Sequence, residues 1–341
     1  MRLPAEWEPQ DGVLMAWPHA ETDWSEVLEA VEPVFAAIVR EIALREDVVL
    51  VCREPRHVTG VLAGVGADLG RVHLWDVATN DTWARDFGPI TLVGDGGPLL
   101  LDFGFNGWGL KFAADRDNRI TRELAMLGAL GHRRVKTVGM ILEGGSIESD
   151  GRGTLLTTSQ CLLSPNRNPH LDQAGVEAAL REELGAERVL WLHSGHLVGD
   201  DTDAHVDTLA RLCPDDTIAY VRCDDLGDVH HDGLSLMEQE LRGLRTADGR
   251  PWRLVPLPWP SPKSGPRGRL AATYANFLVI NGAVLVPTYR DRRDGEALAA
   301  VASAFPGRDV VGIDCLPLLE QGGSLHCLTM QLPVGVLRGE A

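Results

Sequence analysis

The sequence of 341 residues predicts a mixed α/β fold built from repeated strand-helix units. Hydrophobic residues make up 44 % of the chain, as in a globular protein with a sizeable core. Short apolar runs alternate with segments of helical periodicity. A strand, a glycine-rich or acidic loop, a helix and another strand recur every roughly 50 to 70 residues without a break in composition. We therefore expect one domain over residues 1–341, in which the repeats close on themselves.

Strands are expected where short apolar or β-branched runs are bounded by turn residues. They comprise the apolar run that ends at Pro18, then 47–52, 72–76, 90–93, 99–103, 154–158, 188–192, 208–213, 274–280, 283–287 and the run after Cys327. The pair 90–93 and 99–103 flanks a glycine-rich turn, and the pair 274–280 and 283–287 flanks Asn281-Gly282. Both pairs are therefore expected to form hairpins.

Helices are expected where apolar residues recur three or four positions apart. They comprise 26–43, 119–130, 176–184, 237–244 and 297–304. The segment 256–266 contains too many prolines for regular structure, and we interpret it as an excursion or a lid.

Charge and composition exclude several classes of partner. The 32 Lys and Arg against 49 Asp and Glu give a net charge of −17, which repels nucleic acid and anionic lipid and favours cationic ligands. The first residues contain no apolar signal segment, and no run approaches the ~18 apolar residues of a membrane span. We expect a cytoplasmic protein without nucleic-acid or membrane partners, and a homo-oligomer is left open. The six cysteines lack CxxC spacing, which argues against a disulfide framework and a structural zinc site.

Four loops carry candidate chemistry: Asp86, Glu143, His205 with Asp207, and Cys327. Each has an ordinary structural explanation when taken singly, as an ion pair, a turn residue, a hydrogen-bonding pair on one face of a strand, or a small buried residue. Together they describe a reaction. His205 could activate a Cys327 thiolate, and Glu143 could fix the tautomer of that histidine. Asp86 and Asp207 match the N–H forks of a planar guanidinium, which favours a guanidine over an ester or amide substrate.

Several motifs resemble one enzyme family. They are Pro-Ala-Glu-Trp-Glu-Pro at 4–9 with Met-Ala-Trp-Pro at 15–18, Asn-Asp-Thr-Trp-Ala-Arg-Asp-Phe-Gly-Pro at 80–89, Glu-Gly-Gly-Ser-Ile-Glu at 143–148, Asp-Thr-Asp-Ala-His-Val-Asp at 201–207 and Gly-Gly-Ser-Leu-His-Cys at 322–327. In this order, over about residues 4–333, they resemble the agmatine deiminase and bacterial-type peptidylarginine deiminase family. The resemblance implies a pentein fold, a five-bladed α/β propeller, and cofactor-free hydrolysis of a guanidine to a ureido group and ammonia.

The resemblance also implies residue roles. Cys327 matches the nucleophile, His205 the general acid and base, and Glu143 the carboxylate paired with that histidine. Asp86 and Asp207 match the guanidinium-binding aspartates, and Asn276 matches a residue that lines the site. Ala204 stands where many members have glycine, which removes no functional group.

The expected reaction passes through a covalent thiouronium adduct on Cys327, without cofactor or metal. Agmatine, which would give N-carbamoylputrescine, is the favoured substrate, and peptidylarginine and free arginine are the alternatives. Trp83 is expected either to flank the substrate or to pack in the core. His326 is not expected to be the base, because neighbours on an extended strand face opposite ways. The paired glycines 322–323 are expected to let the backbone approach the substrate.

Two other classes remain as alternatives. A metallohydrolase could use Asp200, Asp201, Asp203, His205 and Asp207 as ligands, although this leaves Cys327 and Glu143 idle. A catalytically inactive member of the fold could act as a binding protein.

Overall fold

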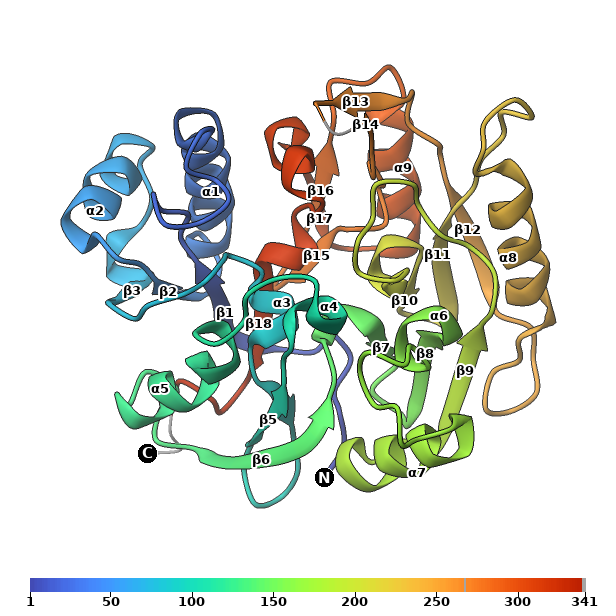
Figure 1. The fold of residues 1–341 in the computed structure, drawn as a ribbon, viewed down its shortest axis with the longest axis horizontal. Helices are drawn as coiled ribbons and strands as arrows, with labels where there is room; N and C mark the ends of the chain where they lie inside the picture. The colour runs from blue at the N-terminus through green and yellow to red at the C-terminus, as the bar shows by residue number, and fades with distance from the viewer. Residues whose placement is uncertain (267, 339–341) are drawn as a thin grey trace.

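Five sheets of one repeated design form the body of the computed structural model, which describes residues 1–266 and 268–338 (Figure 1). In each sheet the first strand is antiparallel to the second, and the second is parallel to the third. Four sheets follow chain order: β4 (Ile90–Leu92), β5 (Leu99–Gly104) and β6 (Arg134–Ile141); β7 (Ile147–Ser149), β8 (Thr154–Thr158) and β9 (Arg188–Leu192); β10 (Ala210–Cys213), β11 (Thr217–Val221) and β12 (Arg253–Leu257); β15 (Leu278–Ile280), β16 (Ala283–Thr288) and β17 (Asp309–Asp314).

The remaining sheet joins the two ends of the chain. Its order is β18 (Thr329–Pro333), β1 (Gln10–Ala16), β2 (Asp47–Val51) and β3 (Val72–Trp75). β18 runs antiparallel to β1, with Leu14 opposite Met330. Asp11 also accepts hydrogen bonds from the backbone N–H groups of Gly335, Leu337 and Arg338. The expectation that the repeats return to their start is therefore confirmed at the level of strand pairing.

Helices connect the parallel strands of each sheet. They are α1 (Leu28–Ala43), α2 (Pro55–Gly64), α5 (Ile120–Met126), α7 (Gln173–Leu184), α8 (His231–Gly243) and α9 (Asp294–Ala304). In α1 the apolar residues Val31, Phe35, Ile38 and Ile42 recur at helical spacing and are fully buried. Figure 1 shows α2, α5, α7 and α8 toward the rim, whereas the short helices α3 (Ala84–Phe87) and α4 (Gly107–Leu110) lie near the centre. α6 (Ser159–Leu162) is likewise a single turn.

The expected hairpins β4–β5 and β15–β16 are confirmed. The expectation that 256–266 lacks regular structure is confirmed for 258–262 and wrong on either side of these residues. β12 includes Pro256, which an edge strand tolerates because its N–H side needs no partner. β13 (Lys263–Gly265) pairs with β14 (Gly268–Leu270) in a small separate hairpin. None of the helices within the described residues combines the length and apolar character that a membrane crossing requires.

Candidate active site

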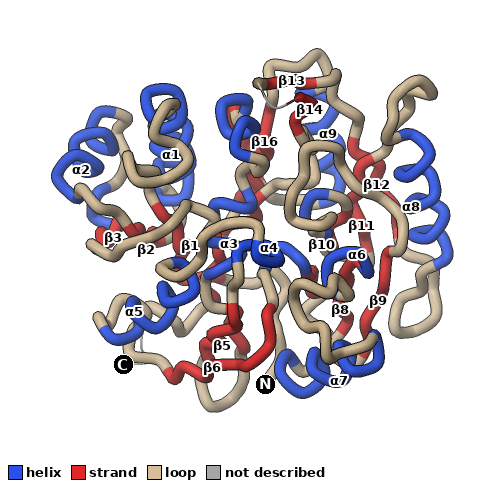
Figure 2. The backbone as a smooth tube through the Cα atoms, viewed as in Figure 1, coloured by secondary structure: helices blue, strands red, loops and turns tan. Residues whose placement is uncertain are grey.

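The predicted site residues all lie in connections between one sheet and the next, just before the first strand of a sheet. They are Asp86 before β4, Glu143 before β7, His205 and Asp207 before β10, Asn276 before β15 and Cys327 before β18. The turn of α3 packs against the 3-10 turns Gly144–Ser146 and His326–Leu328, and Gly144–Ser146 packs against Val206–Thr208. Figure 2 shows the connections that carry α3 and α4 crossing the centre of the molecule. The repeated sheets thus bring distant segments to one place.

Cys327 is buried, and its Sγ lies 3.2 Å from Asn276 Nδ2 and 3.8 Å from Asp207 Oδ2. It belongs to the 3-10 turn His326–Leu328, so the expectation of an extended strand at this residue is wrong. Asn276 Oδ1 accepts the backbone N–H groups of His326 at 2.9 Å and Cys327 at 3.3 Å, which fixes this turn. Burial, reinforced by Asp207 and Asp86, raises the pKa of the Cys327 thiol well above its ordinary value.

Asp86 uses both carboxylate oxygens within the protein. Oδ1 accepts the Gly145 N–H at 3.0 Å, and Oδ2 accepts the Trp108 indole N–H at 2.9 Å. Burial, followed by the nearby charge of Asp207, raises the pKa of Asp86 well above its ordinary value. A Cβ atom at residue 145 would lie 2.6 Å from His205 Nδ1 and 2.9 Å from Asp86 Oδ1. Glycine at this position therefore lets the imidazole and the carboxylate approach each other.

Asp207 has one oxygen occupied and one free. Oδ2 accepts a hydrogen bond from His326 Nδ1 at 2.7 Å, whereas buried Oδ1 has no hydrogen-bond partner among the described residues. Burial acts to raise the pKa of Asp207, but the hydrogen bond and charge of His326 outweigh it and hold this pKa below its ordinary value. The carboxylate is thus ionised and can accept two further N–H groups.

His205 is completely buried, and within the described part of the chain neither ring nitrogen has a hydrogen-bond partner. Its Nδ1 lies 3.7 Å from Asp86 Oδ1. Burial is the largest influence on its pKa and lowers it to about 3, so the imidazole is neutral. The preceding residues Asp203 (φ 67°) and Ala204 (φ 63°) are both left-handed, a conformation that favours the glycine expected at 204. Asp200 supports this turn by accepting the N–H groups of Thr202 and Ala204.

Glu143 does not make its expected hydrogen bond to His205. Its two carboxylate oxygens accept the Nε–H of Arg167 at 2.8 and 3.0 Å, and both side chains are fully buried. Arg167 also binds Asp203 at 2.6 Å. A carboxylate forms a stronger, charge-assisted hydrogen bond with a guanidinium than with a neutral imidazole, which explains why Glu143 bonds Arg167 rather than His205. Glu143 and His205 remain neighbours, because a carboxylate oxygen of Glu143, a ring nitrogen of His205 and Cys161 Sγ all lie within 4.8 Å of one another.

A cavity of about 440 Å³ leads to Cys327 and Asp86. Trp83, Trp108 and Phe112 supply apolar walls, and Asp23, Asp81 and Asp201 supply carboxylates. Its described lining includes no Lys or Arg. Trp83 both lines the cavity and packs: it is 4 % exposed, bonds Asp81 through Nε1 at 3.1 Å and lies 5.5 Å from the ring of Trp24.

The paired glycines line the cavity, and the expectation that their backbone approaches the substrate stays a prediction. A Cβ atom at Gly323 would lie 2.3 Å from Trp83 Cζ3, and Gly322 has a left-handed φ of 86°. These residues thus make room for the Trp83 ring and turn the chain towards Cys327. Pro266 and Leu270, which flank or belong to the β13–β14 hairpin, share a neighbouring open cavity with Asp23 and Gln321, so the hairpin lies beside the mouth.

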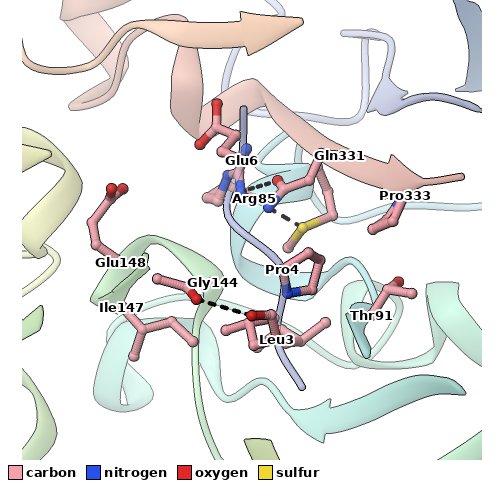
Figure 3. A pocket seen from close by; sticks show the side chains of 13 residues that line it. Leu3, Pro4, Glu6, Arg85, Thr91, Gly144, Ile147, Glu148, Gln331 and Pro333 are labelled. Atoms are coloured by element: carbon pink, nitrogen blue, oxygen red, sulfur yellow. Dashed lines mark hydrogen bonds between the residues drawn. The ribbon is translucent and has the colours of Figure 1, made fainter. Parts of the chain in front are cut away.

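A second cavity, of about 510 Å³, lies behind α3 (Figure 3). Arg85 and Gly144 line it, and these residues adjoin Asp86 and Gly145 in sequence. The Arg85 guanidinium bonds Gln331 in this cavity, as Figure 3 shows. None of the predicted site residues is part of its lining. We therefore place the candidate site in the cavity of Cys327.

Two acidic residues of the alternative metal site are engaged elsewhere. Asp200 supports its own turn, and Asp203 pairs with Lys111 at 2.6 Å and with Arg167. Among the described residues, the groups with metal-like spacing are Glu143, Cys161 and His205, and Glu6, Glu148 and His326. Neither includes Asp200, Asp201 or Asp203.

Sequence reasoning missed Trp108, Arg167 and Glu6 as parts of the site. Trp108 (φ 55°) stands in a run of left-handed residues, which the glycines of Asn106-Gly-Trp-Gly109 could have signalled. Arg167 follows a Ser-Pro-Asn turn, and its pairing with Glu143 has no local signal.

Comparisons with known proteins cover nearly the whole chain. Residues 2–333 match the family model described as Porphyromonas-type peptidyl-arginine deiminase. Agmatine deiminase from Pseudomonas aeruginosa (strain LESB58) is 35 % identical over 97 % of this chain and 95 % of its own. A solved structure from Porphyromonas gingivalis, provisionally assigned as an arginine deiminase, is 49 % identical with a TM-score of 0.93, over 98 % of this chain and 99 % of that one.

A substrate-bound variant of C. jejuni agmatine deiminase, with serine in place of one cysteine, is 36 % identical over 97 % of this chain and 96 % of that one, with a TM-score of 0.90. Dimethylarginine dimethylaminohydrolase is only 12 % identical over 95 % of this chain and all of its own, with a TM-score of 0.52, and is similar in fold alone. The chain thus shares its mixed α/β fold with this enzyme. The match over residues 2–333 shows that the chain belongs to the Porphyromonas-type peptidyl-arginine deiminase family.

Proposed function

We propose that this protein hydrolyses agmatine to N-carbamoylputrescine and ammonia. The observation that carries the proposal is that the Cys327 thiol and the Asp86 carboxylate line one acidic cavity, while Asp207 has its Oδ2 3.8 Å from Cys327 Sγ and its Oδ1 without a partner among the described residues. Relatives named agmatine deiminases, 35 % identical over nearly the whole chain, support it.

Guanidinium recognition follows from the free acceptor positions. Asp207 Oδ1 has no partner, and each oxygen of Asp86 accepts one protein N–H and retains a second lone pair. Two carboxylates at one cation match the N–H forks of a planar guanidinium. A cation here also counteracts the mutual repulsion that raises the pKa of Asp86. We propose Asp86 and Asp207 as substrate-binding residues, with Trp83 and Asn276 as supporting walls.

The chemical steps use Cys327 and His205. The thiol proton passes to the neutral imidazole, and the thiolate bonds to the guanidinium carbon. The imidazolium returns the proton to the departing nitrogen, which leaves as ammonia, and a thiouronium adduct remains. The imidazole then takes a proton from water, whose oxygen bonds to the same carbon. Collapse breaks the carbon–sulfur bond, Cys327 regains a proton and the ureido product leaves.

The remaining site residue, Glu143, we propose as an electrostatic neighbour of His205. A carboxylate oxygen of Glu143 lies within 4.8 Å of a ring nitrogen of His205, so its negative charge can stabilise the transient imidazolium. Arg167 keeps this carboxylate in place.

Agmatine is favoured over arginine by the charge of the cavity. The carboxylates of Asp23, Asp81 and Asp201 line the same cavity, and its described lining lacks a cation for an α-carboxylate. A second positive charge on the substrate fits this field, whereas a carboxylate does not. Peptidylarginine remains the rival, since it carries no α-carboxylate and the family model bears that description.

Ammonia release from agmatine, free arginine and a blocked arginine peptide tests the choice. We expect release from agmatine alone at an appreciable rate. Release only from the peptide would overturn the substrate while leaving the family membership intact. Cys327→Ser should abolish turnover and retain agmatine binding. Inhibition by a thiol-alkylating reagent but not by a chelator would exclude the metallohydrolase alternative.

We also propose that the five sheets are the blades of a five-bladed propeller in a single cytoplasmic domain. The repeated strand order and the β1–β18 pairing support this arrangement. The expected domain, 1–341, includes residues 267 and 339–341, which lie outside the described residues.

A further inference from the structure

His326, the neighbour of Cys327, joins two buried carboxylates. Its Nδ1 lies 2.7 Å from Asp207 Oδ2, and its Nε2 lies 2.8 Å from Glu6 Oε2. The side chain is 1 % exposed. Sequence reasoning excluded His326 as the base but gave it no role. These contacts connect the candidate site to the first residues of the chain.

The neighbouring carboxylates constrain which ring nitrogen of His326 carries a hydrogen. Electrostatic contacts with His326 and Arg211 hold the pKa of Glu6 below its ordinary value against the effect of burial. The pKa of Asp207 is also held low, so both groups are ionised and can only accept. Asp207 Oδ2 can only accept, so Nδ1 of His326 carries a hydrogen and donates it to this oxygen. Nε2 lies between Glu6 Oε2 and the donor Arg211 Nη2.

Glu6 is itself held firmly. Its second oxygen accepts the Val279 N–H at 2.7 Å, and Arg211 Nη2 donates to Oε2 at 2.6 Å. Arg211 in turn bonds Glu148 and the carbonyl of Phe277, and its guanidinium lies 4.4 Å from the centre of the Phe277 ring. Arg211 Nη2 also lies 3.0 Å from His326 Nε2, and both groups contact Glu6 Oε2. Glu6, which contacts Nε2 of His326, is thus held by both Val279 and Arg211.

We propose that His326 is a positioning residue for substrate binding: anchored by Glu6, it holds Oδ2 of Asp207 and keeps Oδ1 free to accept the guanidinium. The inference rests on the proposed function, because it takes Asp207 to be a guanidinium-binding residue. It gives the N-terminal segment a part in the site, through Glu6.

Two substitutions test the contacts of His326 with Asp207 and with Glu6 separately. The amide nitrogen of Asn stands close to the place of His Nδ1, and that of Gln close to the place of His Nε2. His326→Asn should thus keep the donor to Asp207, whereas His326→Gln should keep only the donor to Glu6. We design both in the Cys327→Ser background, so that agmatine binding can be measured by calorimetry without turnover.

We expect His326→Gln and His326→Ala to weaken agmatine binding at least about tenfold, because Asp207 loses its buried hydrogen-bond donor. His326→Asn should stay within about threefold of the parent, and Glu6→Gln should fall between these limits. Asp150→Asn is the matched control. Asp150 is equally buried and accepts the N–H groups of Arg152 and Thr154, but it lies in the turn between β7 and β8 and outside the cavity lining. It should lower the melting temperature without changing agmatine affinity.

Equal affinity of the Asn and Gln variants would overturn the inference, as would parental affinity in His326→Ala. This comparison holds even if the alanine variant does not fold. A parent that binds none of agmatine, arginine and the blocked peptide would instead overturn the proposed function, and the role of His326 with it.

Discussion

Asp207→Asn should make the Cys327 thiol more reactive while it destroys the guanidinium site. The structure places Asp207 Oδ2 3.8 Å from Cys327 Sγ, and the negative charge of Asp207 is one cause of the raised thiol pKa. Two unit charges at this separation interact by about 4 kcal/mol at an effective dielectric constant of ~20. His326 already neutralises part of the Asp207 charge, so we expect a smaller net effect, of at least about tenfold in the fraction of thiolate.

Alkylation by iodoacetamide at neutral pH, followed by mass spectrometry of the peptide that contains Cys327, measures this fraction. All six cysteines are buried, so only the peptide that contains Cys327 is compared, and Cys327→Ser supplies the blank. Asp86→Asn should give a smaller increase, because the raised pKa of Asp86 already reduces its charge. Asp102→Asn, a buried carboxylate on β5, controls for loosening of the fold. Alkylation of Asp207→Asn at or below the wild-type rate would refute the electrostatic reasoning.

Three further predictions concern the supports of the site. Gly323→Ala brings a Cβ atom to 2.3 Å from Trp83, so the ring must move by about 1 Å to restore contact distance. We expect a roughly tenfold higher KM for agmatine and a free energy of unfolding lower by about 1–3 kcal/mol. Gly96→Ala is the control, because its Cβ atom meets no described atom within 4 Å, and it should change neither value. Burial lowers the pKa of His205 from 6.5 to about 3, so between these values the unfolded chain binds more protons at this residue than the folded chain. The free energy of unfolding should therefore fall as pH decreases from about 6.5, and urea titrations should show a flatter fall in His205→Gln. Glu143→Gln leaves the buried Arg167 with Asp203 as its remaining carboxylate and should lower the free energy of unfolding by about 3 kcal/mol; a change below about 1 kcal/mol would show that Asp203 suffices.

Local sequence signals predicted much of the fold. The Asn281-Gly282 turn identified the β15–β16 hairpin, and the apolar face of α1 identified that helix. α8 begins at His231, earlier than expected, because its first turn is mostly polar and lacks the apolar spacing that marks a helix. α2 was missed for a similar reason, since it buries only Val58 and Leu62. Where burial rather than sequence periodicity decides the ends of an element, the pattern alone gives only part of it.

The site was predictable as a set of residues but less so as a set of contacts. The motif residues Cys327 and Asp207 do lie 3.8 Å apart, sulfur to oxygen, from turns separated by 120 positions. Glu143 was expected to bond His205, yet it bonds Arg167, whose position 24 residues further on carries no periodic signal. Such partners depend on which buried charge must be neutralised, and that is settled by tertiary packing rather than by local pattern.

The repeated sheets explain why the chemistry is distributed so widely along the chain. Each predicted residue follows the last strand of one sheet and precedes the first, short strand of the next, as Glu143 stands between β6 and β7 and Cys327 between β17 and β18. A connection of this kind must leave one sheet and enter another, so its backbone cannot be satisfied by strand pairing and is held instead by buried side chains. Asn276 and Asp86 do this by accepting backbone N–H groups from neighbouring connections, at His326 and Gly145 respectively. Asp86 lines the cavity of Cys327 and Asn276 contacts the Cys327 Sγ, so the side chains that hold the connections also surround this thiol, and binding a guanidinium there uses acceptors that the fold already requires to be buried.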